Sequence, residues 1–152
     1  MPPTMTQMYT PRYVVLYADD DQDDLDLVLD AFAQFTDNVD VITAQDGYEA
    51  LSYLKNLPPL EPSPCLIILD MNMPRLDGKE TLKKIRSLDR FRDVPVVIFT
   101  TSSFALDKDF AEANGAGFIT KPLDLKQFSI IAEQFISHCA DGIKQNIQRR
   151  IR

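Results

Sequence analysis

The sequence contains few of the residues that bind zinc or form disulfide bridges. Its 152 residues include two cysteines, Cys65 and Cys139, and a single histidine, His138. A structural zinc site needs four ligands, usually arranged in closely spaced pairs, and these three residues cannot supply them. We therefore exclude a zinc site and interpret both cysteines as core residues, because free cysteine behaves as a small buried hydrophobe.

Basic side chains are in the minority. The chain has 16 lysines and arginines against 23 acidic residues, which gives a net charge of −7. A protein that binds duplex nucleic acid usually presents a basic surface, so we expect no nucleic-acid ligand. A cation, or a basic patch on a partner protein, fits this composition better.

Long apolar segments are also missing. The first eleven residues (MPPTMTQMYTP) contain no apolar signal core, and the longest uncharged run, 94–106, has 13 residues and includes proline, threonine and serine. A membrane-spanning helix needs about 20 apolar residues. We therefore expect a soluble, cytoplasmic protein without membrane contact. Its length and its 45% of hydrophobic residues suit one domain with a sizeable core.

What the sequence does contain is a regular alternation of apolar runs and amphipathic segments. The runs predict strands and the segments, with apolar residues at helical spacing, predict helices. The predicted strands are 12–18, 39–43, 65–69, 94–99 and 117–120, and the predicted helices are 23–35, 46–57, 77–88, 103–114 and 124–139. Strands without polar alternation are buried on both faces, so we predict an α/β domain with a doubly wound, five-stranded parallel sheet.

One segment interrupts this alternation. Residues 57–64 (LPPLEPSP) contain four prolines, which no helix or central strand accommodates, so they form a predicted loop.

A dense acidic segment follows the first predicted strand. Residues 17–24 (YADDDQDD) hold five carboxylates, and Asp70 stands in the same place after the third strand. Neighbouring carboxylates repel by about 1 kcal/mol in water and about 4 kcal/mol at an intermediate dielectric. Ligands of doubly wound sheets bind at the carboxyl ends of the strands, and Mg²⁺ prefers oxygen ligands. The pattern therefore predicts a magnesium site formed by these acids.

Two further polar groups end predicted strands. The fourth strand ends in Thr100-Thr101-Ser102, and the fifth ends in Lys121-Pro122. A hydroxyl and an ammonium beside a metal-bound carboxylate suit phosphoryl transfer, because they bind the oxygens on which charge accumulates. Aspartate can itself accept a phosphoryl group as an acyl phosphate.

Four motifs, taken in order, resemble the receiver domain of two-component response regulators. They are YADDD, LIILDMNMPRLDG, VVIFTTSS and GFITKPLD. The resemblance covers about residues 12–139 and implies a flavodoxin-like sheet of order 2-1-3-4-5. Residues 1–11 would then be an N-terminal extension and residues 140–152 a basic C-terminal tail.

The resemblance implies a role for each matching acid. Asp70 would be the phospho-acceptor, and it would bind Mg²⁺ together with Asp19, Asp20 and the main-chain carbonyl of Asn72. Asp21, Asp23 and Asp24 have no implied metal role, and we expect Asp21 or Asp23 in the first turn of the following helix, where acids favour the helix dipole.

The resemblance also implies how the phosphoryl group is bound and sensed. Thr100 and Lys121 would contact it, and the Lys121–Pro122 peptide bond would be cis. Thr100 and Phe118 would form the switch, because Phe118 stands where the family has its switch aromatic. Asn72 and Ser102 occupy the positions at which family members tune dephosphorylation.

The expected partners follow from the same family. A sensor histidine kinase or a histidine phosphotransfer protein would donate the phosphoryl group, and an unknown downstream protein would read it. Phosphorylation and autodephosphorylation would be self-catalysed, so we expect a switch and not an enzyme with a separate substrate. The surface of the fourth helix, fifth strand and fifth helix would change, and a homodimer could form through it or through the tail.

Two segments give finer hints. The loop at 57–64 resembles a subset of stand-alone receivers that includes those paired with bacterial phytochrome kinases. The tail carries a charge of +3 against −10 for the remaining chain, with Ile143, Ile147 and Ile151 at four-residue intervals. It is either a helical or frayed end with a solvated basic face or a segment whose isoleucines dock into an apolar groove.

Three other interpretations of the acidic residues and of the fold agree less well with the sequence. A calcium loop is excluded, because Asp24 stands where an EF-hand needs glycine and Asp30 replaces the closing glutamate. An aspartate-nucleophile phosphatase needs a second acid two residues after the first, where this chain has Asn72. A degenerate receiver-like scaffold would have lost an acid or the lysine, and this chain keeps them all.

Overall fold

A five-stranded parallel sheet forms the centre of the protein. The computed structural model describes residues 12–148. The sheet consists of β1 (Tyr13–Ala18), β2 (Val39–Ala44), β3 (Leu66–Leu69), β4 (Val96–Thr100) and β5 (Gly117–Thr120). Its order is β2-β1-β3-β4-β5, and all neighbouring strands pair in parallel. The predicted fold class and strand order are therefore confirmed.

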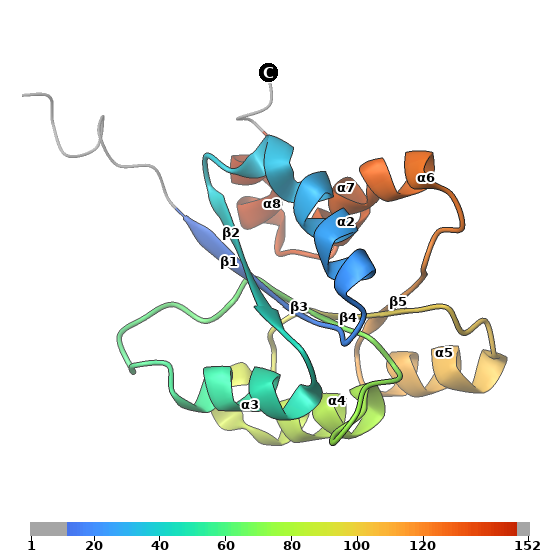
Figure 1. Ribbon diagram of the computed structural model, residues 1–152. Coiled ribbons are helices and arrows are strands. Elements are labelled where there is room, and N and C mark those ends of the chain that lie inside the picture. Colours follow the sequence, from blue (N-terminus) through green and yellow to red (C-terminus); the bar gives the residue numbers. More distant parts are fainter. Residues whose placement is uncertain (1–11, 149–152) are drawn as a thin grey trace, which may run out of the picture.

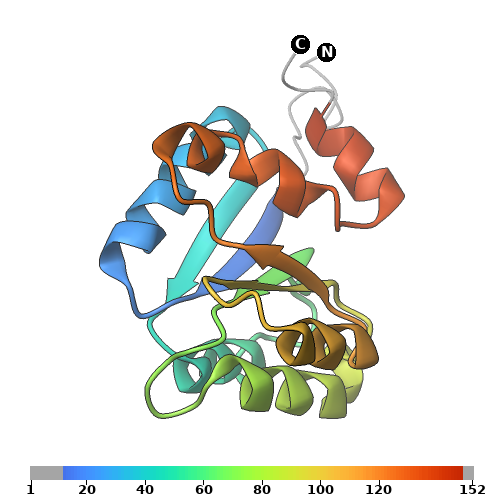
Figure 2. The same ribbon diagram turned by 90° about the vertical axis from the view of Figure 1, so that its right-hand side faces the viewer.

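Helices cover both faces of the sheet. They are α2 (Gln22–Phe32), α3 (Gly47–Lys55), α4 (Gly78–Ser87), α5 (Ala105–Ala113), α6 (Leu125–Ser129), α7 (Ile131–Ile136) and α8 (Asp141–Gln148), with 3-10 turns at Ala33–Phe35 and Asp89–Phe91. Helices α3, α4 and α5 lie on one face, and α2, α6, α7 and α8 on the other (Figures 1 and 2). No helix within residues 12–148 has the length and apolarity needed to cross a membrane.

Aspartate side chains begin four of the helices. Asp21, Asp46, Asp77 and Asp124 each accept a hydrogen bond from the main-chain N–H three residues further on. Such an N-cap stabilises a helix by about 1 kcal/mol. The cap at Asp21 uses one carboxylate of the acidic segment for local structure, and Asp23 lies in the first turn of α2, where acids were expected.

The core is split by the sheet into two layers. Along β1, Val15 and Tyr17 pack with the α2, α6 and α7 side, while Leu16 and Ala18 pack with the α3, α4 and α5 side. Phe99 is an aromatic centre of the first layer, with its ring centroid 4.9 Å from that of Phe135. Because the strands are buried on both faces, their sequences lack polar alternation.

The last predicted helix is corrected by the structure. Residues 124–139 form two short helices, α6 and α7, separated at Ile130, whose φ and ψ are −106° and 5°. The main-chain N–H of Ile130 bonds to the carbonyl of Gln127, which makes a tight turn in place of a regular α-helical turn. The break leaves Leu125 and Ile130 exposed while Phe128 and Ile131 stay buried.

The described part of the tail packs on this chain's own core. In α8, Ile147 is fully buried against the first core layer and Ile143 is half-buried. The Asn146 amide donates a hydrogen bond of 2.8 Å to the hydroxyl of Tyr13. These isoleucines therefore meet an intramolecular surface, while Ile151 lies outside the described residues. The domain boundary at residue 139 stays a prediction.

Candidate functional site

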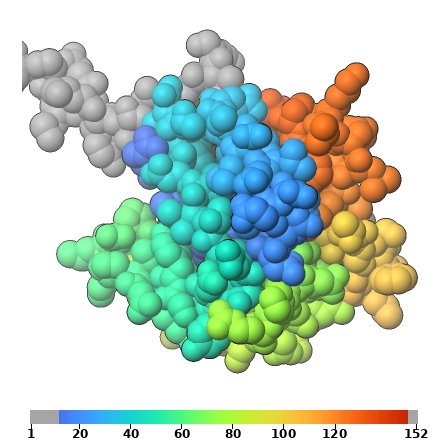
Figure 3. All heavy atoms as spheres, in the orientation of Figure 1, coloured from blue at the N-terminus to red at the C-terminus, as the bar shows by residue number. Residues whose placement is uncertain are grey.

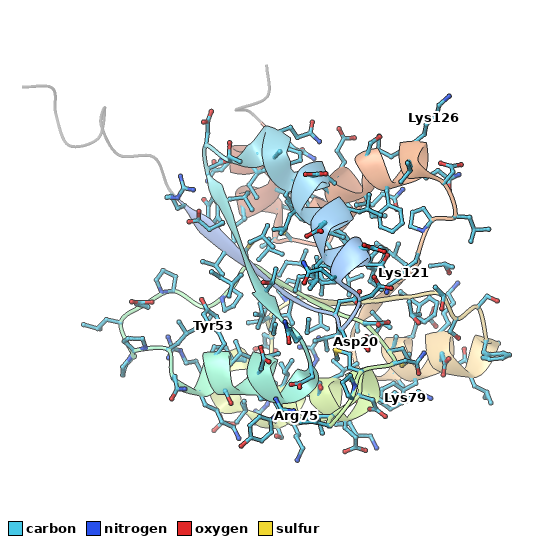
Figure 4. All side chains as sticks on the ribbon, in the orientation of Figure 1. Asp20, Tyr53, Arg75, Lys79, Lys121 and Lys126 are labelled. Carbon is cyan, nitrogen blue, oxygen red and sulfur yellow. The ribbon has the colours of Figure 1, made fainter. Side chains whose placement is uncertain are left out.

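Three carboxylates meet where two adjacent strands end. Asp19 follows β1 and Asp70 follows β3, and the last residues of these strands, Ala18 and Leu69, pair in register. Carboxylate oxygens of Asp19, Asp20 and Asp70 all lie within 4.8 Å of one another. Asp19 and Asp70 are buried, whereas Asp20, which is labelled in Figure 4, is exposed. The three acids that were expected to share a cation are therefore neighbours in space.

Burial and the neighbouring negative charge make ionisation of Asp70 unfavourable. Burial, together with the negative charge of Asp19, raises the pKa of Asp70 to about 7, although Lys121 and main-chain N–H groups act in the opposite direction. A divalent cation would offset this repulsion, and the donors are the carboxylate oxygens that Mg²⁺ prefers. The residues present thus fit a magnesium ion, held by Asp19, Asp20 and Asp70. The role of the Asn72 carbonyl stays a prediction.

Asp19 is held in place by several donors. The hydroxyl of Tyr17 donates a 2.6 Å hydrogen bond to Asp19 Oδ2, and the main-chain N–H of Asp21 donates a 2.9 Å bond to Oδ1. Tyr17 is fully buried, and burial followed by the charge of Asp19 raises the pKa of its phenol, so it remains a donor. Tyr17 was not among the predicted site residues, although it stands two residues before Asp19 and therefore lies on the same side of the sheet.

Lys121 joins this cluster from β5. Its ammonium nitrogen lies 2.7 Å from Asp24 Oδ2, 2.9 Å from Asp19 Oδ2 and 3.6 Å from Asp70 Oδ2. Burial lowers the pKa of Lys121, but the hydrogen bonds to Asp24 and Asp19 outweigh burial and raise it. Lys121 is therefore a buried cation beside Asp19, Asp24 and Asp70. Asp24 was given no role by the sequence analysis.

Thr100 lies at the end of β4 and is completely buried. Its hydroxyl oxygen accepts a hydrogen bond from the main-chain N–H of Ser102 at 3.2 Å, and its carbonyl accepts one from the N–H of Lys121 at 2.7 Å. The Ser102 hydroxyl donates to Asp107, which also pairs with Lys79. Thr100 is thus linked directly to the segment before α5.

Gly78 allows the loop after β3 to close on Asp70. Its N–H donates a 2.9 Å hydrogen bond to the carbonyl of Met71. A Cβ atom at this position would lie only 2.3 Å from the carbonyl oxygen of Asp70. The loop that carries Asn72 can therefore fold back over Asp70 because residue 78 has no side chain.

Two expectations next to the site have different outcomes. Phe118 is half-buried and packs against the core layer of α3, α4 and α5, and its switch role stays a prediction. The cis Lys121–Pro122 bond is wrong, because no cis peptide occurs in residues 12–148. A trans bond is preferred by about 0.5–1 kcal/mol before proline.

The fold and the cluster of acids, threonine and lysine at the strand ends are features of a phosphoryl-accepting signalling domain. Residues 15–133 match the family model of the response regulator receiver domain. The chain belongs to this family, and the resemblance given by its four motifs is confirmed.

Similar proteins include receivers linked to phytochromes. Response regulator Rcp1 of Synechocystis sp. is 34% identical over 100 residues, which is 64% of this chain and 68% of that protein. The crystal structure of the phosphorylated cyanobacterial phytochrome response regulator RcpA is 30% identical, with a TM-score of 0.75 over 85% of this chain and 97% of that one. The Mn²⁺-bound form of Rcp1 is 29% identical, with a TM-score of 0.73 over 82% and 92% of the two chains.

Proposed function

We propose that this protein is a response regulator that accepts a phosphoryl group on Asp70 in a Mg²⁺-dependent reaction and thereby changes its binding to partners. The observation that carries the proposal is the convergence of Asp19, Asp20, Asp70 and Lys121 at one end of the sheet. A structure of a similar protein with Mn²⁺ and one in a phosphorylated state support it.

The chemistry follows from the roles of the side chains. A carboxylate oxygen of Asp70 forms the new bond to phosphorus, while the bond from phosphorus to the donor histidine nitrogen breaks and that nitrogen keeps the electron pair. Asp19 and Asp20 would hold Mg²⁺ with Asp70, and the ion, when bound, supplies positive charge to the phosphoryl oxygens. Lys121 adds a second positive charge, and the Thr100 hydroxyl donates a hydrogen bond.

The donor in this proposal is a sensor histidine kinase or a histidine phosphotransfer protein. It would meet the acidic rim formed by the exposed side chains of Asp20, Asp21 and Asp23, beside α2, whose atoms (blue) lie on the face of the molecule that Figure 3 shows. A basic patch on the donor would complement this rim and speed the encounter.

The switch begins at Thr100. Its hydroxyl oxygen accepts from the N–H of Ser102 and can still donate its own hydrogen to the phosphoryl group, so a movement of Thr100 toward Asp70 would also pull on Ser102 and the segment before α5. We propose that Phe118 then turns inward and that the surface of α5, β5 and α6 changes. Phe104, Leu106, Leu123 and Leu125 are exposed near this surface, and such apolar side chains suit a downstream protein or a second copy of this chain.

Incubation with acetyl phosphate and Mg²⁺ tests the proposal. Intact-mass spectrometry should show one added phosphoryl group on the wild type, none on Asp70→Asn, and the wild-type level on Asp23→Asn, which removes an exposed acid of the same segment. Uptake by Asp70→Asn would refute the assignment of the acceptor. Absence of uptake by the wild type would indicate a receiver-like scaffold, and continuous hydrolysis of small phosphoesters would indicate a phosphatase.

A further inference from the structure

The shortest contact of Lys121 is with an acid of a different element. Asp24 lies in the first turn of α2, and its carboxylate is 2.7 Å from the Lys121 ammonium nitrogen. The two side chains are only 19% and 7% exposed. A contact this short between two largely buried groups is a charge-assisted hydrogen bond and not a fluctuating surface ion pair.

The ammonium N–H groups of Lys121 are not shared equally among the three neighbouring carboxylates. An ammonium has three N–H groups, and Asp24 and Asp19 accept at 2.7 Å and 2.9 Å, while Asp70 lies at 3.6 Å, beyond normal hydrogen-bond length. In this state the lysine therefore hydrogen-bonds to Asp19 and Asp24 and interacts only weakly with Asp70.

Asp24 has no place in the cation cluster. Among residues 12–148, the acids whose oxygens converge are Asp19, Asp20 and Asp70. Asp24 stands apart from them, and its side chain reaches the site through Lys121. The direct contact of Asp24 with the site is therefore its hydrogen bond to Lys121.

We propose that Asp24 is a positioning residue that competes with the phosphoryl group for Lys121 and so favours the unphosphorylated state. This inference rests on the proposed function. A phosphoryl group on Asp70 draws the ammonium toward its oxygens, and the hydrogen bond to Asp24 must lengthen or break. The protein gives up that bond on phosphorylation and regains it when the phosphoryl group leaves.

Beryllofluoride, which mimics an aspartyl phosphate, tests this competition at saturating Mg²⁺. Asp24→Asn should reach half-saturation at about a tenfold lower beryllofluoride concentration than the wild type, the size expected for one charge-assisted hydrogen bond. Asp24→Glu keeps the charge and should remain near the wild type. Asp23→Asn removes the same charge from an exposed neighbour on the same helix turn and should shift the midpoint by no more than about twofold.

A second measurement needs no metal or phosphate analogue. Urea unfolding of the metal-free wild type, Asp24→Asn, Lys121→Met and the double variant forms a double-mutant cycle. If the hydrogen bond exists in solution, the shifts of the urea midpoint are non-additive. Additive shifts would show that the two residues are uncoupled and would overturn the inference.

The outcomes separate the inference from the function on which it rests. If the wild type binds no beryllofluoride, the proposed function fails. If the wild type binds it but Asp24→Asn and Asp23→Asn shift equally, the effect is general charge and only the role of Asp24 fails. Weaker binding by Asp24→Asn would mean that Asp24 holds the lysine in its productive position, which is the opposite of competition.

Discussion

Replacement of Asp70 by asparagine is expected to stabilise the metal-free protein, and to do so more at pH 8 than at pH 5. Asp70 is buried beside Asp19, and its pKa is raised from 3.8 to about 7. Asparagine has nearly the same shape and carries no charge that burial could penalise. The variant therefore removes the least favourable ionisation in the cluster.

The magnitude follows from the linkage between pKa and stability. Because the pKa is higher in the folded protein, the folded state binds more protons between pH 4 and pH 7, and stability falls as the pH rises through this range. A shift from 3.8 to about 7 corresponds to at most about 4 kcal/mol at pH 8 and to about 1.5 kcal/mol at pH 5. The stabilisation by Asp70→Asn should therefore grow by about 2–3 kcal/mol between these pH values, a figure that already includes the attraction to Lys121, which acts to lower the pKa of Asp70.

Urea unfolding followed by circular dichroism, in EDTA at both pH values, measures this difference. Added Mg²⁺ should stabilise the wild type by about 2.7 kcal/mol at one hundred times its dissociation constant, and it should stabilise Asp70→Asn much less. Asp23→Asn serves as the control, because its carboxylate is exposed. The reasoning is refuted if the gain for Asp70→Asn is equal at the two pH values or larger at pH 5.

Three further predictions concern the loop, the switch and the tail. Gly78→Ala places a Cβ atom 2.3 Å from the Asp70 carbonyl oxygen, so it should lower the unfolding free energy by about 1–3 kcal/mol and weaken Mg²⁺ binding in a titration. The control is Gly142→Ala, which has no atom within 4 Å of the added methyl group and should leave Mg²⁺ binding unchanged. Equal losses of Mg²⁺ binding in the two variants would contradict the argument. Phe118→Ala should leave beryllofluoride binding within about twofold of the wild type. It should reduce the NMR chemical-shift changes that beryllofluoride causes in α5, because Phe118 is proposed to transmit the signal and does not touch the bound group. Loss of beryllofluoride binding itself would count against a switch role. Ile147→Ala removes a fully buried side chain and should lower the unfolding free energy by about 2–5 kcal/mol in a urea titration, whereas a change below about 0.5 kcal/mol would show that α8 does not pack on the core in solution.

Much of this structure was predictable because the relevant signals are local. The fifth strand has the predicted bounds, Gly117–Thr120, since glycine and a polar end delimit a short apolar run. Asp46, Asp77 and Asp124 begin helices as predicted, because a cap depends only on a side chain and the N–H three residues later. The convergence at the strand ends followed from a rule about parallel sheets and not from any detail of packing.

The features that were missed depend on distant contacts. Lys121 and Asp24 are 97 residues apart, and their contact requires α2 to lie where β5 ends, which no local pattern encodes. Cys65 and Cys139 were interpreted as separate core residues, yet their sulfur atoms lie 3.9 Å apart in the folded protein. The break at Ile130 is equally invisible, because the same apolar spacing is compatible with one continuous helix.

The distribution of donors explains how the fold tolerates so many acids in one place. Asp21 caps a helix, Asp24 pairs with Lys121, and Asp19 accepts from Tyr17, Lys121 and a main-chain N–H. The repulsion that remains falls on Asp70, because burial and the charge of Asp19 raise the pKa of its carboxyl to about 7. A cation bound beside Asp70 relieves this repulsion. Part of the affinity for metal therefore comes from the removal of a carboxylate repulsion that already destabilises the metal-free folded protein. The residue that we propose as the acceptor is thus also the one that gains most when positive charge arrives.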